Sequence, residues 1–239
     1  TWSNLEDRGT VIVGFDDTFV PMGFKDGSGE IVGFDIDLAK EAIGRMGLEA
    51  EFQPIDWNLK ETELNSENID MIWNGYTITP ERQEKVNFSN PYLDNRQVIV
   101  VLSDSDIEAK DELADRIVAT QNASSALTAI TDSGAAETFD GGEPILFDTY
   151  NDAFMDLEAE RVDAVIADEI LARYYIAERG EEKYRVLADD FGDEEYGVGV
   201  RKGDATLLEN LNTALNEMKE DGTAAEISDK WFGEDIIKQ

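Results

Sequence analysis

The sequence contains no cysteine and no histidine. Without cysteine there are no disulfides, no thiol nucleophile and no thiolate metal ligand. Without histidine as well, the usual zinc sites and most catalytic triads are excluded. Thiol and imidazole chemistry are therefore closed to this chain.

Basic residues are scarce too. The chain has 20 lysines and arginines against 54 aspartates and glutamates, a formal net charge of -34 and a pI near 4.1. Such a charge argues against nucleic acid and anionic membrane surfaces as partners. It also implies self-repulsion at low ionic strength, which salt screens over about 10 Å at 0.1 M. Our hypothesis is an organism that lives in high salt; an ordinary acidic secreted protein is the alternative that composition leaves open.

Long hydrophobic runs are absent as well. No stretch approaches the length of a membrane span, and no charged-then-apolar leader is found at the start of the chain. The 239 residues, 41% of them hydrophobic, are nevertheless enough for two packed lobes.

Predicted strands and helices alternate along two stretches of the chain. The first has strands at 10–15, 48–53 and 69–73, with helices at 36–46 and 56–64. The second has strands at 117–120, 145–147 and 162–167, with helices at 112–116, 126–131, 150–159 and 170–179. This alternation is typical of mostly parallel sheets flanked by helices. Further helices at 204–220 and up to about 233 predict that the chain returns to its first unit at the end.

Other segments join these units. A long β-branched strand is expected at 96–102, and the acidic segments 103–111 and 188–195 are expected to be connections. The segment Asp26–Gly29 predicts a hairpin turn, because it lacks the acidic pattern and distal glutamate of a calcium loop. Asp35 is expected to cap the helix that follows it.

The segment from Ile72 to Tyr92 gathers hydroxyls, aromatic rings and one arginine behind a buried strand. Pro80 is expected to open a short helix with Thr79 as its N-cap. Arg82 follows in the first turn, and a guanidinium beside hydroxyls suits a carboxylate group because arginine offers a planar fork of donors. The alternative is that Arg82 is a surface residue paired with a neighbouring acid.

Four motifs now point to a known family. They lie in order along nearly the whole chain, at Gly33–Ala39 (GFDIDLA), Thr77–Arg82 (TITPER), Phe88–Tyr92 (FSNPY) and Val162–Glu169 (VDAVIADE). With these motifs the chain resembles the amino-acid-binding, family 3 solute-binding proteins of ABC importers, such as the lysine/arginine/ornithine-, histidine- and glutamine-binding proteins.

The resemblance implies an α/β, two-lobe periplasmic-binding-protein fold of type II. Each lobe would be a mostly parallel sheet flanked by helices, and two hinge strands would join the lobes. Lobe one would hold residues 1–95 and 189–239, and lobe two residues 96–188. Closure of the lobes would trap one ligand.

The family's ligand positions also carry over to this chain. Phe19 and Trp57 look like the aromatic pair that sandwiches the ligand side chain. Arg82 looks like the residue that binds the α-carboxylate, with the Thr77 hydroxyl beside it, and Asp168 like the acceptor for the α-ammonium. Each of the last three comes from a motif or lies directly beside one.

The remaining positions are less distinctive. Gly75 looks like the residue whose backbone meets the ligand, Ser125 like a second carboxylate anchor at a helix start, and Asp16 like the acid near the distal end of the ligand. The expected set is completed by Asn74, Tyr76, Gln121 and Ser124. Two departures from the family concern the ligand: Ala123 stands where many relatives have glycine, and Asn74-Gly75 where many have serines.

Each position also has an ordinary structural interpretation. Phe19 and Trp57 could be core aromatics, Ser125 a helix cap, Asp168 a first-turn acid favoured by the helix dipole, and Asp16 a turn cap.

The resemblance implies a monomeric, non-enzymatic receptor that captures an L-amino acid and delivers it to an ABC permease, with no catalytic residue, no metal and no cofactor. It would work outside the cytoplasm, in the periplasm or lipid-anchored at the outer face of the cell membrane, with a signal segment absent from this chain. Arginine is favoured as the ligand, then lysine or glutamine, because Asp16 lies beyond the aromatic pair and no spare basic residue is evident to meet an acidic side chain. A dehydratase-like enzyme and the ligand-sensing domain of a receptor are the alternatives.

Overall fold

The computed structural model describes residues 1–238 and divides the chain into two compact units. Unit 1 comprises Thr1–Asp94 together with the segment from Glu195 onward, and unit 2 comprises Asn95–Glu194. The chain passes between them within two long strands, β8 (Leu93–Leu102) and β12 (Tyr184–Tyr196). Within residues 1–238 no helix combines the length and apolar character needed to cross a membrane.

The extent of β12 corrects the expectation of an acidic connection at 188–195, and it puts the second passage at 194/195 rather than 188/189. β12 lies at the edge of its sheet, next to β8. An edge strand can keep charged side chains in solvent while its backbone pairs on one side. The acidic composition of 188–195 therefore predicted a connection where the structure has the second part of β12.

Unit 1 is built on a five-stranded mixed sheet in the order β5-β1-β6-β13-β7. Its strands are β1 (Thr10–Phe15), β5 (Glu49–Pro54), β6 (Met71–Ile72), β7 (Asn87–Phe88) and β13 (Gly199–Val200). β1 runs parallel to β5 and β6, whereas β13 runs antiparallel to β6 and β7. The register sets Val13 opposite both Phe52 and Met71, so β1 is the buried centre of the parallel part.

A small antiparallel sheet follows β1. It contains β2 (Thr18–Phe19), β3 (Gly23–Lys25) and β4 (Ile31–Val32). The expected hairpin turn between β3 and β4 is confirmed, because Asp26 Oδ1 accepts hydrogen bonds from the backbone N–H groups of Ser28 and Glu30. No calcium loop is needed to explain these residues.

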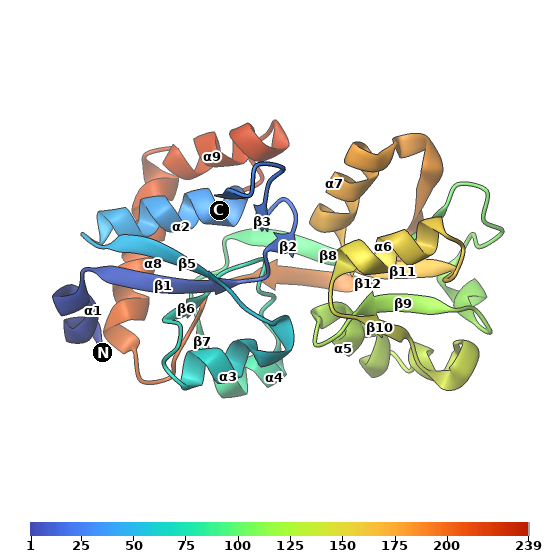
Figure 1. Ribbon diagram of the computed structural model, residues 1–239, viewed down its shortest axis with the longest axis horizontal. Coiled ribbons are helices and arrows are strands. Elements are labelled where there is room, and N and C mark those ends of the chain that lie inside the picture. Colours follow the sequence, from blue (N-terminus) through green and yellow to red (C-terminus); the bar gives the residue numbers. More distant parts are fainter. Residues whose placement is uncertain (239) are drawn as a thin grey trace. The chain divides into compact units, whose positions relative to one another are not determined.

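The helices of unit 1 are α1 (Trp2–Arg8), α2 (Phe34–Arg45), α3 (Lys60–Asn65), α4 (Pro80–Lys85), α8 (Ala205–Glu220) and α9 (Thr223–Phe232), with a 3₁₀ turn at Trp57–Leu59 before α3. Figure 1 shows α2 and α9 on one side of the sheet and α3 and α4 on the other. α3 packs on β1 and β6, and this side of the sheet holds a core of Trp57, Leu64, Ile69, Ile72, Tyr76 and Val86.

The start of α2 differs from the expectation that Asp35 caps it. Gly33 occupies the N-cap position, with a φ of 144° that favours glycine, and a Cβ there would lie 2.2 Å from Met22 O. Asp35 is inside the first turn, where its side chain is buried.

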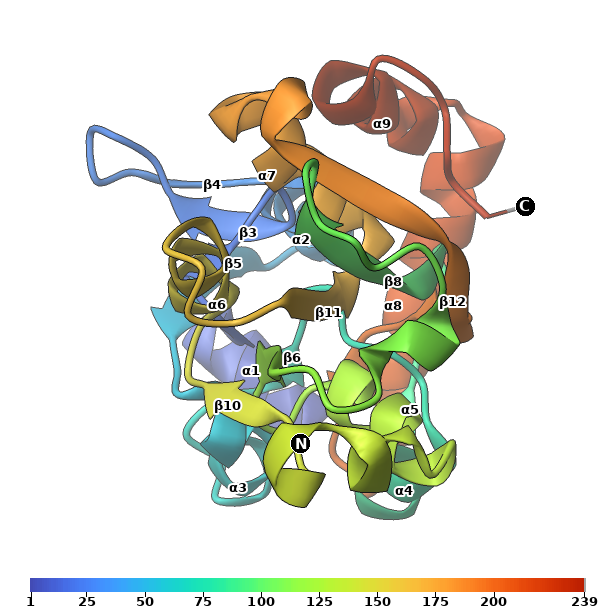
Figure 2. The same cartoon turned by 90° about the vertical axis from the view of Figure 1, so that its right-hand side faces the viewer.

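Unit 2 has a five-stranded sheet in the order β10-β9-β11-β8-β12, with β10 and β12 at opposite edges (Figure 2). β9 (Val118–Gln121) is parallel to β10 (Ile145–Phe147) and β11 (Ala164–Asp168), and β8 is antiparallel to β11. The helices α5 (Ser125–Asp132), α6 (Tyr150–Glu158) and α7 (Glu169–Arg179) follow β9, β10 and β11 in turn. The helix expected at 112–116 is a 3₁₀ turn at Lys110–Leu113, and three more such turns lie at Ala135–Thr138, Asp140–Gly142 and Glu181–Lys183.

Candidate functional site

The loops after β1 and β6 carry the first group of expected site residues. The two strands are parallel neighbours, so their C-terminal ends meet at one edge of the sheet, where ligands bind in α/β folds. Asn74 Nδ2 donates to Asp16 O at 3.3 Å and joins the loops. The Asp16 carboxylate accepts from Thr18 N at 2.9 Å and Thr18 Oγ1 at 2.6 Å, which fixes its orientation.

Gly75 is required at its position by its backbone conformation. Its φ is +55°, and a Cβ would lie 2.8 Å from Phe19 Cε1 and 3.2 Å from the ring of Tyr196. Its N–H donates to Asp35 Oδ2 at 2.6 Å. The backbone at Gly75 is therefore held between an aromatic ring and a buried carboxylate.

Arg82 is fixed by its own unit. The Thr79 side chain accepts from Arg82 N at 3.2 Å, which confirms the expected N-cap of α4. Arg82 Nη1 donates to Thr77 O at 2.9 Å, and the guanidinium lies over the Tyr76 ring, 4.7 Å from its centroid. Arg82 is buried, so the alternative of an exposed surface residue is wrong.

Tyr76 supports its neighbours from inside the core. Its ring meets Trp57 edge-on at 5.8 Å and stacks on Phe88 at 4.9 Å between centroids. Its hydroxyl donates to Glu61 Oε1 at 2.8 Å. Burial raises the pKa of this phenol, so it stays protonated as the donor. Direct contact between Tyr76 and a ligand stays a prediction.

Lys60 is a residue that sequence reasoning missed. It is 3% exposed, its Nζ lies 5.0 Å from the Trp57 ring centroid, and it donates to Trp57 O at 3.1 Å. Burial, and then the positive charge of Arg82, lower its pKa to about 8. Its Nζ also lies 3.5 Å from Glu61 Oε2, so the expectation that no spare basic residue meets an acidic ligand side chain stays a prediction. The signal was the spacing of three residues between Trp57 and Lys60 at a helix start.

In unit 2, expected site residues gather where β9 enters α5. Ser124, not Ser125, is the N-cap, because Ser124 Oγ accepts from Leu127 N at 3.1 Å. Ala123 has a φ of +54°, a left-handed conformation that favours glycine. Gln121 Nε2 donates to Asp148 O at 2.8 Å, so this amide joins β9 to the segment after β10.

Asp168 and Ser125 belong to one polar cluster. Asp168 ends β11 and stands at the N-cap position of α7, but its side chain does not cap the helix. Instead Asp168 Oδ1 accepts from Gln97 Nε2 at 2.7 Å. The same Gln97 Nε2 lies 3.2 Å from Ser125 Oγ and 2.8 Å from Glu194 Oε2, and Ser125 Oγ donates to Glu194 Oε2 at 3.2 Å.

Gln97 and Glu194 were not expected in this cluster. Gln97 is opposite Asp168 in the antiparallel register of β11 and β8, whereas Glu194 lies near the end of β12. The one signal in the sequence was an amide among the β-branched residues of β8, and the structure shows that this amide is fully buried.

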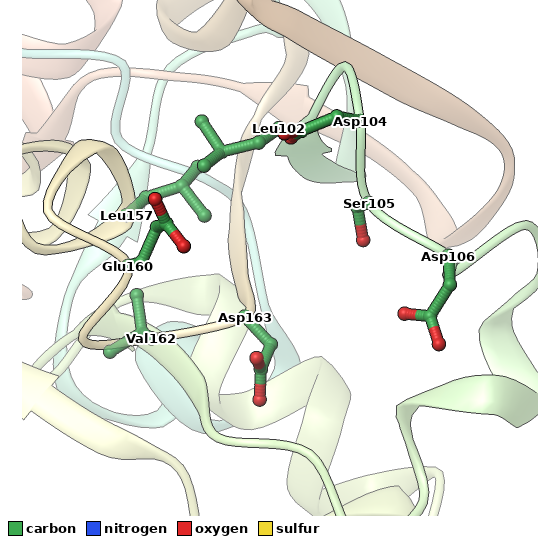
Figure 3. A pocket seen from close by; sticks show the side chains of 8 residues that line it. All are labelled: Leu102, Asp104, Ser105, Asp106, Leu157, Glu160, Val162 and Asp163. Atoms are coloured by element: carbon green, nitrogen blue, oxygen red, sulfur yellow. The ribbon is translucent and has the colours of Figure 1, made fainter.

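A separate pocket of about 310 Å³ lies elsewhere in unit 2, lined by Leu102, Asp104, Ser105, Asp106, Leu157, Glu160, Val162 and Asp163. Figure 3 shows the carboxylates of Asp106, Glu160 and Asp163 well apart. Asp106 pairs with Arg116, and Asp163 accepts from Ile117 N. Among residues 1–238 no group of acids is placed to hold a metal ion.

The fold is that of a type II periplasmic binding protein. The model of the bacterial extracellular solute-binding proteins, family 3, matches residues 11–234, and the chain belongs to this family. Like its relatives, it is a solute-binding protein and not an enzyme.

Relatives with different ligands resemble the chain to similar degrees. The L-cystine-binding protein TcyJ of Escherichia coli is 30% identical over 99% of this chain and 87% of its own. A substrate-binding protein of an ABC uptake transporter from Streptococcus pneumoniae, solved with bound histidine, has a TM-score of 0.97 and 39% identity over 100% of this chain and 98% of its own. An ancestral arginine-binding protein, solved with arginine, has a TM-score of 0.89 and 40% identity over 95% of this chain and 99% of its own.

Proposed function

We propose that this protein captures an L-α-amino acid outside the cytoplasm and delivers it to an ABC permease. The observation that carries the proposal is the pair Arg82 and Asp168, one charge in each unit, each fixed by neighbours in its own unit. A zwitterion needs a cation for its carboxylate and an anion for its ammonium. A ligand that contacts both residues favours a closed state because only that state provides both contacts.

The expected roles of the other residues fit this ligand. Ser125 and Thr77 would add hydrogen bonds to the carboxylate, and Gly75 would offer its backbone. Phe19 and Trp57 would enclose the side chain of the ligand between apolar faces. These roles follow from the family resemblance and from the placement of the residues within each unit.

Acceptors beside the aromatic pair favour a ligand side chain that donates hydrogen bonds. Asn74 Oδ1 is buried and accepts no hydrogen bond within residues 1–238, and Asn74 adjoins Asp16. An unsatisfied buried acceptor costs about 1–3 kcal/mol, which a donor on the ligand would recover. Arginine is thus the favoured ligand, followed by lysine and glutamine.

Lys60 favours a second ligand class. The Lys60 ammonium, which lies 3.5 Å from Glu61 Oε2, adds a positive charge beside Trp57 that disfavours a cationic side chain and would favour an acceptor. Histidine, glutamine and cystine each carry an acceptor beyond the α-carbon. Relatives that bind histidine and cystine make this class a specific alternative.

The remaining parts of the proposal follow from the family. The protein would act as a monomer, in the periplasm or lipid-anchored at the outer face of the cell membrane, together with a permease. A sensor domain of a receptor is the alternative role, and neighbouring permease and ATPase genes or a kinase domain in the same chain would distinguish the two.

The test is a thermal-shift and calorimetric screen of the common amino acids and cystine in high salt. A ligand at about 100 times its Kd adds about 2.7 kcal/mol to the free energy of unfolding. Asp168→Asn keeps an acceptor for Gln97 but removes the charge, so it should weaken ligand affinity by about 10- to 100-fold.

Glu169→Gln is the matched control. Glu169 is the next residue along the chain, but it pairs with Arg96 and Arg173 instead of the polar cluster. It should leave ligand affinity unchanged. A wild-type protein that binds no amino acid contradicts the receptor function, and a clear preference for glutamate or aspartate contradicts the proposed ligand class.

A further inference from the structure

The carboxylate of Asp35 is buried in unit 1 and joins two distant segments. Asp35 is 1% exposed. Its Oδ2 accepts from Gly75 N at 2.6 Å, and its Oδ1 accepts from the Tyr92 hydroxyl at 2.8 Å. The Trp73 indole lies beside the same carboxylate and favours its charged form, although its N–H makes no well-aligned hydrogen bond.

The two segments matter for different reasons. Gly75 lies in the backbone between Asn74 and Thr77, and its N–H donates to Asp35 from a residue with a positive φ. Tyr92 immediately precedes β8, the strand in which the chain leaves unit 1. Its ring stacks on Phe34 of α2, with centroids 6.5 Å apart. One carboxylate therefore fixes the backbone of the candidate site and the start of the connecting strand.

We propose that Asp35 is a positioning residue for ligand binding, whose ionised carboxylate holds the Gly75 backbone in its binding conformation and ties it to Tyr92. This inference rests on the proposed function, because it concerns the same ligand. Asp35 touches no ligand itself and acts through Gly75.

The protonation state of Asp35 decides whether its carboxylate accepts both hydrogen bonds, from Gly75 N and from the Tyr92 hydroxyl. An ionised carboxylate accepts from both donors, whereas a protonated one is itself a donor and competes for the same partners. The Gly75 N–H cannot become an acceptor. Burial raises the pKa of Asp35 from its ordinary value of 3.8 to about 7, and the hydrogen bonds from Tyr92 and Gly75, together with the nearby Trp73 indole, oppose that rise.

Few other groups titrate in this range. The chain has no histidine, and Tyr92, whose pKa burial raises well above 10, is the titratable group in contact with Asp35. Charged residues on elements that pack around α2 have partners of their own, namely Lys230 with Asp37, Arg45 with Asp221, Lys25 with Asp17, and Arg8 and Arg201 with Asp70. Exposed Glu49 and Glu51 of β5 and buried Lys60 beside Trp57 complete the surroundings that a pH profile must consider.

The experiment measures Kd by calorimetry from about pH 6 to about pH 8, with L-arginine, L-glutamine, L-histidine and L-cystine as probes. The ionised fraction of a group with a pKa of about 7 falls about tenfold over that range. Wild-type affinity should therefore fall by up to about tenfold on acidification.

Three variants test the assignment. Asp35→Asn should bind more weakly at pH 8 and lose the pH dependence, since its amide cannot ionise. Tyr92→Phe removes a donor that lowers the pKa of Asp35, so the midpoint of the affinity profile should move to higher pH. Asp37→Asn, two residues along the same helix and bonded to Lys230 and Trp231, is the control and should keep the wild-type profile.

Stability separates positioning from a purely structural role. The pKa of Asp35 is raised in the folded protein, so its contribution to stability is present below about pH 3.8 and is lost as pH rises through about 7. Asp35→Asn should thus gain stability relative to wild type between pH 6 and pH 8, while binding more weakly at pH 8. Circular dichroism checks that the variants fold. If Asp35→Asn does not fold, the shift of the pH midpoint in Tyr92→Phe tests the inference.

Each outcome has one meaning. A midpoint near 7 that moves with Tyr92→Phe and vanishes in Asp35→Asn supports the inference. If wild-type affinity is independent of pH, or if Asp35→Asn binds with the same affinity as wild type at pH 8, the inference is overturned and the proposed function still stands. A wild-type protein that binds no amino acid at pH 8 overturns the proposed function, and the inference with it.

Discussion

At the scale of single residues, Arg82 shows how this chain prepares a cation for binding. A backbone carbonyl, Thr77 O, and the face of Tyr76 orient the guanidinium. Both contacts use features that lysine lacks, namely a planar group and several donors at fixed angles. The Thr79 cap sets the first turn that carries Arg82. The local segment from Tyr76 to Arg82 thus supplies all three of these contacts.

Gly75 permits a prediction at the same scale. Gly75→Ala should lower the free energy of unfolding by about 2 kcal/mol or more. A φ of +55° is sterically unfavourable for alanine, and the alanine Cβ would lie 2.8 Å from Phe19 Cε1. Amino-acid affinity should fall as well, since Phe19 and the Gly75 backbone are both displaced. Urea unfolding and calorimetry measure the two effects.

Gly27→Ala is the control for that substitution. Gly27 lies in the hairpin turn with open space around the position of its Cβ. It should change neither stability nor affinity by a measurable amount. Equal effects of the two substitutions would contradict the assigned role of Gly75.

At the scale of elements, the start of α5 divides two adjacent serines by role. Ser124 caps the helix through Leu127 N, whereas Ser125 Oγ donates to Glu194 and lies beside Gln97 Nε2. A helix begins where one side chain satisfies a free N–H, and the next residue is then released for other contacts. Sequence alone leaves open which serine does which, because either can cap.

This division predicts opposite phenotypes. Ser124→Ala should cost about 1 kcal/mol of stability and leave amino-acid affinity nearly unchanged. Ser125→Ala should weaken affinity by about 3- to 10-fold, as expected for one lost hydrogen bond, with less effect on stability. Thermal unfolding and calorimetry on both variants decide the matter; weaker binding in Ser124→Ala alone would assign the roles the other way.

Elements with strong local signals were predictable. The apolar spacing of α8, the β-branched run of β1 and the Thr79-Pro80 start of α4 agree with the structure because local sequence decides them. β12 was not predictable, since pairing at a sheet edge stabilises it despite acidic side chains.

The candidate site follows the same division. Arg82 and Asp168 lie in motifs, so sequence indicates them. Gln97 and Asp35 owe their contacts to segments up to 97 residues away along the chain, as Gln97 does with Glu194. No local pattern marks such contacts, and burial of their polar groups was visible only in the folded chain.

At the scale of the whole molecule, the acidic residues far exceed the available cations. The arginines of unit 2 each contact a carboxylate, at Arg96, Arg116, Arg161, Arg173, Arg179 and Arg185. These pairs cannot balance 54 acids against 20 bases. Exposed pairs are individually worth about 0–1 kcal/mol, so the dominant surface interaction is repulsion among carboxylates.

Salt should therefore stabilise the protein. The screening length falls from about 10 Å at 0.1 M to about 3 Å at 1 M, which removes most repulsion between surface carboxylates. If this relieves about 2 kcal/mol, Tm should rise by about 4–8 °C over that range. Differential scanning calorimetry in KCl measures the rise. The triple variant Asp132→Asn, Glu137→Gln, Glu143→Gln neutralises exposed acids in one region of unit 2 and should show a shallower rise. A Tm that falls as KCl approaches molar levels would exclude the high-salt interpretation of the acidic surface.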